Sequence, residues 1–563
     1  MIENISESDL VQWQNSSPDD FVKSLKRIND NFEEYYAFGH VDVESRYRIQ
    51  AVFRERFRET SAIRQQVLRF LRILARDGQN LDQLLSSNMV QDVLGAGLLS
   101  EQSFEFNWES FIQAEMCLIN ILFNSTLARS EFNEIASNLL LNRIRLLSDT
   151  PRSSFRQRDI TDIPVTVQDI ATCVKSKIPE FPIKILSNEQ MDLVAFYDLR
   201  IAFVASAQSK DLQLQWLRNG CEVFLKVLEQ GLNFPKKLKQ NSQWRSFAEN
   251  TNWALKILFN IFCYSWDDSV ESNAKQCMLL CSKIVTLENI DPSLEQSAID
   301  VIAVLPLSFE WLAPKLQNVK KKDINLIHDG RDMTFANAVL QALKRRLETE
   351  NNERNELLGT FLTVLIRLSS QVKEARHYLR LQVIPPLHAT DVERRPDDGA
   401  ELRNRMVRLM MSISNTQDLA AEFIFILCKK SVNRFVKYCG FGHAAGLLAN
   451  RGILNALNTP KHLSDSEASE TEDYKAIEMQ VNPVTGCIEP SGENPFTGMT
   501  EEQKEYEIHR LMNDINKLMN QGLITPGQIG KDGQLEPVKH VLELVKDGDA
   551  EPDKSDSEND VGS

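Results

Sequence analysis

Two sets of residues in this sequence have types and spacings that suggest bound cofactors or metals. Gly440, Gly442 and Gly446 resemble the glycine fingerprint of a dinucleotide site. However, their spacing is G-x-G-x-x-x-G, and a helical pattern precedes them where a strand is required. Cys277 and Cys281 lie one helical turn apart with no histidine pair nearby, so buried thiols are favoured over a metal site.

Motifs for phosphate binding and for acid–base catalysis are not found. Gly530-Lys531 is followed by Asp532 and lacks the earlier glycine of G-x-x-x-x-G-K-[ST]. The eight histidines are dispersed, and no nucleophile–base pair can be assigned from the sequence. We therefore predict a protein that is not an enzyme and that has no catalytic site, no metal and no cofactor.

One group of basic residues stands out in a chain whose formal net charge is −15. Arg69, Arg72 and Arg76 recur at three- and four-residue spacing, which predicts one helix face. A solvated surface is one interpretation. The other is that Arg72 and Arg76 bind the terminal carboxylate of a partner chain. Amides that can add contacts to a bound peptide backbone are Asn120, Asn124 and Asn260.

A second basic group and a pair of serines suggest regulation by charge. Lys373, Arg376 and Arg380 precede the segment QVIPPL, where they can simply cap a helix C-terminus. Ser464 and Ser469 each have a glutamate three residues later, the pattern of a casein-kinase-two-type kinase. Such matches are common by chance in acidic linkers. We predict that a kinase of this type phosphorylates both serines.

The elements that must position these residues are helices. Apolar residues repeat with the helical period, as over 67–74, and strand signals are nearly absent. The segments EMCLINILFN (115–124) and NWALKILFNI (252–261) share the sequence Ile-Leu-Phe-Asn. This repetition favours an all-α solenoid of helix pairs or triplets, with an irregular helical domain as the alternative. Further helices are expected over 191–207, 212–228, 274–287, 335–348, 357–369, 402–412 and 419–428.

The helical body is expected to end in the stretch FVKYCGFGHAAGLLANRG (435–452). A helix over 432–438, a break at Gly440 and Gly442 and a second helix over 444–448 precede a glycine cap at Gly452. Between 464 and 507 there are twelve acidic residues and two lysines, a net of 12 − 2 = 10 negative charges. We expect a solenoid over 1–457, an acidic linker with phosphosites over 458–499, an amphipathic tail helix over 500–522, and an acidic, mostly disordered tail over 523–563.

The tail helix has clear start and stop signals. Thr500 and Gln503 form a capping box, and Gly522 ends the pattern. The helix either docks on its own body or is offered to a partner. Its apolar stripe includes Ile508, Leu511, Ile515 and Leu518.

Composition limits the location and the partners. The acidic balance argues against a broad nucleic-acid surface. Nine scattered cysteines favour a reducing compartment, and the sequence contains neither a signal-peptide pattern nor a run long enough to cross a membrane. A cytoplasmic protein is therefore expected.

Several segments resemble the synembryn family of chaperones and guanine-nucleotide exchange factors. They include AAEFIFILC (420–428), EDYKAIEMQVNPVTG (472–486), NPFTGMTEEQKEYE (494–507), RILARD (72–77) and FYDLRIAF (196–203). The resemblance implies an armadillo/HEAT-like right-handed superhelix, followed by a largely extended acidic tail carrying one amphipathic helix. It also implies heterotrimeric G-protein α subunits as partners, nucleotide-free or GDP-bound and without βγ, and recruitment to the plasma membrane or cell cortex through them.

The family further implies how the partner is held. The α subunit's C-terminal helix would lie in the concave trough, and the tail would wrap its nucleotide domain. Phosphates on Ser464 and Ser469 would dock on Lys373, Arg376 and Arg380. This sequence departs from the family at the second phosphosite, where a threonine is usual. An armadillo-type peptide-binding adaptor without exchange activity is the alternative function.

Overall fold

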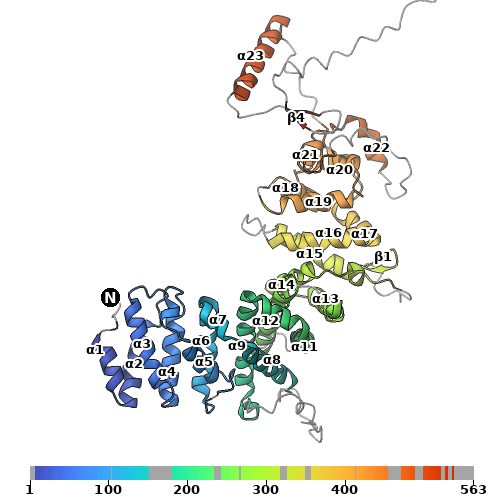
Figure 1. Cartoon of the computed structure of the whole chain (residues 1–563). Coiled ribbons are helices and arrows are strands. Elements are labelled where there is room, and N and C mark those ends of the chain that lie inside the picture. Colours follow the sequence, from blue (N-terminus) through green and yellow to red (C-terminus); the bar gives the residue numbers. More distant parts are fainter. Residues whose placement is uncertain are drawn as a thin grey trace, which may run out of the picture. The chain divides into compact units, whose positions relative to one another are not determined.

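In a computed structural model of the 563-residue chain, the described residues form mainly helices (Figure 1). The chain divides into two compact units, residues 1–308 and 309–563. The structure describes residues 5, 7–102, 104–150, 181–233, 242–264, 268–316, 326–348, 357–412, 414–453, 471–488, 499–520, 527–529 and 535–537.

The first unit consists of helices that begin at the side-chain caps the sequence provides. Thr60, for example, accepts a hydrogen bond from the Ile63 backbone N–H (3.2 Å), and Asn107 accepts one from Ser110 (3.0 Å). The helices are α1 (Glu7–Asn15), α2 (Pro18–Phe32), α3 (Val43–Arg56), α4 (Ser61–Leu74), α5 (Ser87–Ala96), α6 (Trp108–Asn124), α7 (Thr126–Glu131), α8 (Glu134–Asp149), α9 (Asn188–Gln208), α10 (Lys210–Asn219), α11 (Cys221–Asn233), α12 (Ser242–Tyr264), α13 (Glu271–Val285) and α14 (Pro292–Val304).

These helices stack in layers along the chain. α4 packs on α6, α6 on α9, α9 on α12 and α12 on α14. Apolar side chains such as Phe70, Leu118 and Leu258 are completely buried between the layers. Layers that each contact mainly their neighbours are typical of helical-repeat proteins.

A buried ionic cluster joins three of these helices. Arg143 in α8 donates hydrogen bonds to Asp198 in α9 and to Glu115 in α6, and all three side chains are at most 3% exposed. Burial raises the pKa of the Glu115 carboxyl well above its ordinary value. Burial also raises the pKa of the Asp198 carboxyl, so one arginine faces two buried carboxyl groups whose charged forms are both disfavoured.

The second unit contains further helices and two short hairpins. The hairpin β1–β2 is antiparallel, and His328 pairs with Arg331. α16 packs against α15, α17 and α19, and α18 also packs on α19. The elements are the 3₁₀ helix η7 (Phe309–Leu312), β1 (Ile327–His328), β2 (Arg331–Asp332), α15 (Thr334–Glu348), α16 (Leu358–Gln371), α17 (Lys373–Val383), the 3₁₀ helix η10 (Ala389–Val392), α18 (Leu402–Met410), α19 (Gln417–Leu427), α20 (Val432–Cys439), α21 (Phe441–Asn450), α22 (Glu472–Ile477), α23 (Glu501–Asn520), β3 (Gly527–Ile529) and β4 (Leu535–Pro537).

The prediction of an all-α fold is confirmed, with two local differences. The helix expected over 212–228 is broken between α10 and α11 at Gly220, a residue of low helix propensity. The β1–β2 hairpin was not predicted. It turns through Asp329 and Gly330, whose φ angles of 47° and 74° are those of a two-residue type I′ turn.

The stretch 435–452 contains the two predicted helices, but the break is at Gly440 alone because Gly442 lies inside α21, and residues 471–488 fold against the stretch. α20 ends at Cys439, Gly440 has a φ of 75°, and α21 follows, with Gly452 at a φ of 65°. The backbone N–H groups of Phe441 and Gly442 donate to the carbonyls of Pro483 and Val484 (2.8 and 3.0 Å). This part of the expected linker is therefore held on the body in a defined conformation.

Gly440 and Gly486 make that close approach possible. A Cβ on Gly440 would lie 3.0 Å from the Thr485 carbonyl, and one on Gly486 would lie 2.7 Å from Pro396. Both glycines also have positive φ, which residues with side chains rarely adopt. Within the described residues, no helix is long and apolar enough to cross a membrane.

Candidate functional site

The predicted arginine cluster surrounds a carboxylate from the chain itself. Glu33, directly after α2, accepts hydrogen bonds from Arg69 Nε and Nη2 (3.0 and 2.9 Å). Arg72 Nη2 donates to both Glu33 oxygens (2.6 and 2.9 Å), and Arg76 Nη2 donates to Oε1 (2.8 Å). Arg69 also pairs with Asp30 (2.7 Å). Arg76 follows the end of α4 and is not on its face, but its guanidinium reaches the same carboxylate.

The cluster is partly shielded from solvent. The side chains of Arg72 and Arg76 are 13% and 16% exposed, and that of Glu33 is 32% exposed. Partial burial raises the pKa of the Glu33 carboxyl, but hydrogen bonds from Arg69 and Arg72 outweigh it and leave that pKa below its ordinary value. Three arginines and two carboxylates carry a net charge of 3 − 2 = +1. The geometry is therefore that of a carboxylate-binding site.

The three predicted asparagines contact the chain's own backbone. Asn120 donates to the Arg72 carbonyl (2.9 Å) and Asn124 to the Ala75 carbonyl (2.8 Å). These carbonyls are at the C-terminal end of α4, where intrahelical partners are lacking. Asn260, at the equivalent position of the second Ile-Leu-Phe-Asn segment, donates to the Phe203 carbonyl (3.5 Å) and to Ser206 Oγ (3.1 Å) near the C-terminal end of α9. Their contact with a partner peptide stays a prediction.

The second basic group does not form one exposed face. Lys373 is exposed, whereas Arg376 is half-buried and donates to the Ser369 carbonyl (3.3 Å). Arg380 is 5% exposed and forms a hydrogen bond with Tyr438. Lys373 and Arg376 are therefore the accessible members of the group. Ser464 and Ser469 lie outside the described residues.

The amphipathic tail helix is present as α23. Thr500 and Gln503 exchange the two hydrogen bonds of a capping box (3.1 and 3.3 Å). Ile508 and Leu511 of the apolar stripe are 50% and 62% exposed, so these two residues are not docked on the chain's own body. Their exposure leaves this face available to a partner. Ile515 is half-buried, and the side chain of Leu518 lies outside the described part.

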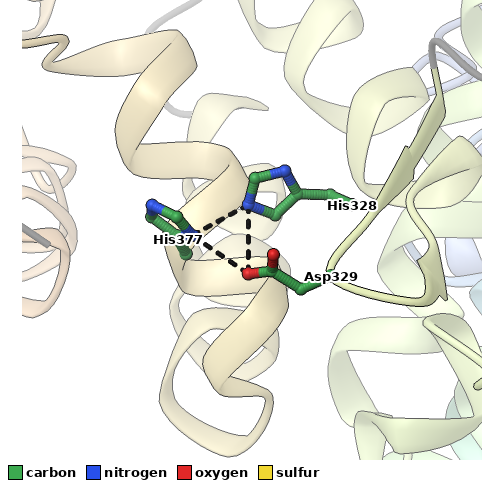
Figure 2. A group of neighbouring side chains, drawn as sticks. All are labelled: His328, Asp329 and His377. Carbon is green, nitrogen blue, oxygen red and sulfur yellow. Dashed lines mark hydrogen bonds and ion pairs between the residues drawn. The ribbon is translucent and has the colours of Figure 1, made fainter.

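One cluster was missed by sequence reasoning. His328, Asp329 and His377 meet between the β1–β2 turn and α17 (Figure 2). The histidines are 49 residues apart, so spacing alone does not bring them together. The Asp329-Gly330 dipeptide is the available signal, because Asp-Gly favours the tight turn of a hairpin.

The stacked helices, the arginine cluster around Glu33 and the exposed tail helix together define a layered, helical protein of the repeat type. The sequence matches the family "Guanine nucleotide exchange factor synembryn" over residues 67–534. The chain therefore belongs to the synembryn family, which consists of exchange factors and chaperones and not of catalytic enzymes.

Alignments with individual relatives cover most of the chain. It is 33% identical to "Chaperone ric-8" of Caenorhabditis elegans over 88% of each chain. It is 28% identical to "Chaperone Ric-8A" of Danio rerio over 98% of this chain and 99% of that one. An engineered protein of solved structure matches over 83% of this chain and 97% of its own, with a TM-score of 0.42 and 13% identity.

Proposed function

We propose that this protein acts as a chaperone and guanine-nucleotide exchange factor for α subunits of heterotrimeric G proteins. The observation that carries the proposal is the convergence of Arg69, Arg72 and Arg76 on one carboxylate. A chain-terminal carboxylate has the same chemistry as the Glu33 side chain. The α subunit's C-terminal helix would bring its terminus to this cluster, along an armadillo/HEAT-like superhelix that the stacked helix layers support.

Exchange would follow from a difference in affinity. The protein binds the nucleotide-free or partly folded α subunit more tightly than the nucleotide-bound one. Because linkage is reciprocal, that difference weakens nucleotide binding by the same factor. The structural change that weakens nucleotide binding is that this protein holds the α subunit's C-terminal helix away from the α subunit's nucleotide domain. The same contacts shield apolar surface in a nascent α subunit, which is the chaperone activity.

The tail contributes a second contact. The exposed apolar face of α23, with Ile508 and Leu511, packs on the α subunit's nucleotide domain. Phosphates on Ser464 and Ser469 dock on Lys373 and Arg376 and bring the tail toward the body. Recruitment to the plasma membrane takes place through the α subunit, in the GDP-bound or nucleotide-free state and without βγ.

Nucleotide release tests the arginine site. An α subunit loaded with labelled GDP is mixed with the wild-type chain, with Arg76→Ala, or with the matched control Arg48→Ala, whose arginine pairs with Glu7 in the same unit (2.7 Å). Loss of one charged hydrogen bond predicts that Arg76→Ala weakens binding by about 1.5–3 kcal/mol, while the control binds as wild type. Thermal unfolding of each variant separates lost binding from lost folding.

Two results would contradict the proposal. Equal binding by Arg76→Ala and Arg48→Ala would leave the arginines with a structural role only. Equal affinity for the GDP-bound and nucleotide-free α subunit, with no faster release, would make the protein a peptide-binding adaptor.

A further inference from the structure

Three atoms that can bind a metal converge from two elements of the second unit. His328 Nε2 lies 2.9 Å from His377 Nδ1 and 3.4 Å from Asp329 Oδ2, and His377 Nδ1 lies 3.1 Å from Asp329 Oδ2. His328 and Asp329 come from the β1–β2 hairpin and its turn, and His377 comes from α17, as Figure 2 shows. The two imidazoles are 21% and 24% exposed, so the cluster lies at the surface with its rings mostly covered.

The hairpin holds its two ligand residues in a fixed position. The positive φ angles of Asp329 and Gly330 fix the turn. The Gly330 carbonyl accepts a hydrogen bond from the Leu316 N–H (2.8 Å), which ties the turn to the preceding segment. Arg331, 7% exposed, forms an ion pair with Glu374 in α17 (3.1 Å). The hairpin and the helix are therefore already joined one turn from His377.

The spacing of the donor atoms suits a cation. His377 Nδ1 lies 3.1 Å from an oxygen of the Asp329 carboxyl group. Only one hydrogen fits between the two imidazole nitrogens, which lie 2.9 Å apart. Without an ion, three electron-rich atoms are thus held together by shared protons. A divalent cation can replace those protons and satisfy all three atoms at once.

We propose that His328 Nε2, His377 Nδ1 and the Asp329 carboxylate bind one zinc ion, with water as the fourth ligand. Tetrahedral zinc with bonds of about 2.0–2.2 Å separates its donor atoms by about 3.3–3.6 Å. The 3.4 Å pair already fits, and the 2.9 and 3.1 Å pairs must lengthen by only a few tenths of an ångström. Two imidazoles and one carboxylate favour zinc over magnesium or calcium, and such a set binds zinc more tightly than iron(II) or manganese(II).

The ion cross-links the hairpin to α17. Zinc that binds only the folded chain stabilises the second unit by RT ln(1 + [Zn]/Kd), so the unfolding temperature rises once free zinc exceeds the dissociation constant. Lys373, one turn before His377, acts electrostatically on Asp329 and so opposes the cation. Replacing Lys373 by glutamine is therefore expected to tighten zinc binding, a change that nonspecific binding would not show.

Titration of the full-length chain tests the site. All proteins carry Cys263→Ser, because this exposed thiol is a separate soft ligand, and are freed of metal with a chelator under a phosphine reductant. Zinc affinity is measured by competition with a chromophoric chelator. Cobalt(II) is added in parallel, since its visible absorption is strong in four-coordinate sites.

Two ligand variants and one matched control complete the design. Asp329→Asn keeps the left-handed turn, because asparagine tolerates positive φ, and His377→Ala removes the ligand on the helix. The control is His388→Ala, whose histidine pairs with Asp473 (3.2 Å) at an exposed site that forms no three-ligand group among the described residues. We expect each ligand variant to lose more than the roughly 10- to 100-fold that removing an outer partner of a ligand costs. The control should bind as wild type.

The proposal is overturned if wild type binds no zinc ion beyond those bound by Asp329→Asn, or if cobalt gives no four-coordinate absorption in wild type. It is also overturned if His388→Ala loses as much affinity as the ligand variants. Circular dichroism and unfolding of the ion-free proteins check that each variant folds. Should His377→Ala misfold, Asp329→Asn alone decides.

Discussion

Replacing Glu33 by glutamine should make the arginine cluster a better receptor for a partner's terminal carboxylate. In the free protein, Arg69, Arg72 and Arg76 all donate to Glu33. A partner carboxylate must therefore share these donors with a second negative charge. Glutamine has the same shape and keeps an acceptor oxygen, but it removes the charge. The net charge of the cluster rises from 3 − 2 = +1 to 3 − 1 = +2.

The size of the effect follows from the repulsion that is removed. Two carboxylates about 5 Å apart repel by roughly 3 kcal/mol at an effective dielectric constant near 20. Solvent reduces this at Glu33, which is 32% exposed. We expect a gain of about 1–2 kcal/mol, or roughly 5- to 30-fold in affinity. Folding should weaken by about 1 kcal/mol or less, because a partly exposed link between α2 and α4 is lost.

The assay compares two peptides with the terminal sequence of the α subunit, one with a free carboxylate and one amidated. Glu33→Gln should bind the free acid more tightly than wild type does, and the amide with unchanged affinity. High salt should reduce the gain. The matched control is Glu7→Gln, which removes a carboxylate paired with Arg48 elsewhere in the unit. An equal change for both peptides, or no gain for the free acid, would refute a direct role of the arginines.

Three further predictions concern stability and the tail. Burial raises the pKa of Glu115 in the fold, so its contribution to stability is complete below its ordinary pKa of 4.5 and is lost as pH rises through the raised folded-state value. Denaturant titrations from pH 5.5 to 8 should show that the free energy of unfolding falls less with rising pH in Glu115→Gln than in wild type. In wild type this one group can contribute a slope of at most about 1.4 kcal/mol per pH unit. Equal slopes in the two proteins would show that Glu115 is already ionised. Truncation before Thr500 should slow nucleotide release while circular dichroism shows the helices intact, and full-rate release would make α23 dispensable. Stoichiometric phosphorylation of Ser464 and Ser469 should accelerate release at low salt, and Arg376→Glu should remove the gain; an unchanged release rate would leave the acidic segment as a tether.

Helix positions were the part of the fold that the sequence predicted best. The helices expected over 335–348 and 402–412 are α15 and α18, because a regular apolar period records which face is buried. The 212–228 pattern also has that period, but Gly220 interrupts the backbone within it. The β1–β2 hairpin has only two residues in each strand, too few for an alternating pattern to be recognised.

Only some of the residues that form the candidate sites could be predicted from the sequence. Spacing grouped the arginines, but Glu33 is 36 residues from Arg69, and only the packing of α2 on α4 brings it to them. For the same reason, Arg380 fits the period of its basic neighbours but is buried against Tyr438. Charge patterns report which residues share a helix face. They do not report which other helix covers it.

The asparagines and the arginines form one unit, and this limits what an asparagine substitution can show. Asn120 and Asn124, in α6, donate to the carbonyls of Arg72 and Ala75. These hydrogen bonds hold the backbone from which Arg72 and Arg76 extend. Removing either amide therefore shifts the guanidinium groups even if no asparagine touches the partner. A loss of binding in Asn124→Ala is expected whether the amide contacts the peptide or only positions Arg76. Asn260 is the informative residue, because it makes a similar contact near the end of α9, a helix whose sequence (188–208) contains one arginine, Arg200. Weaker peptide binding by Asn260→Ala would indicate that the amides contact the peptide directly.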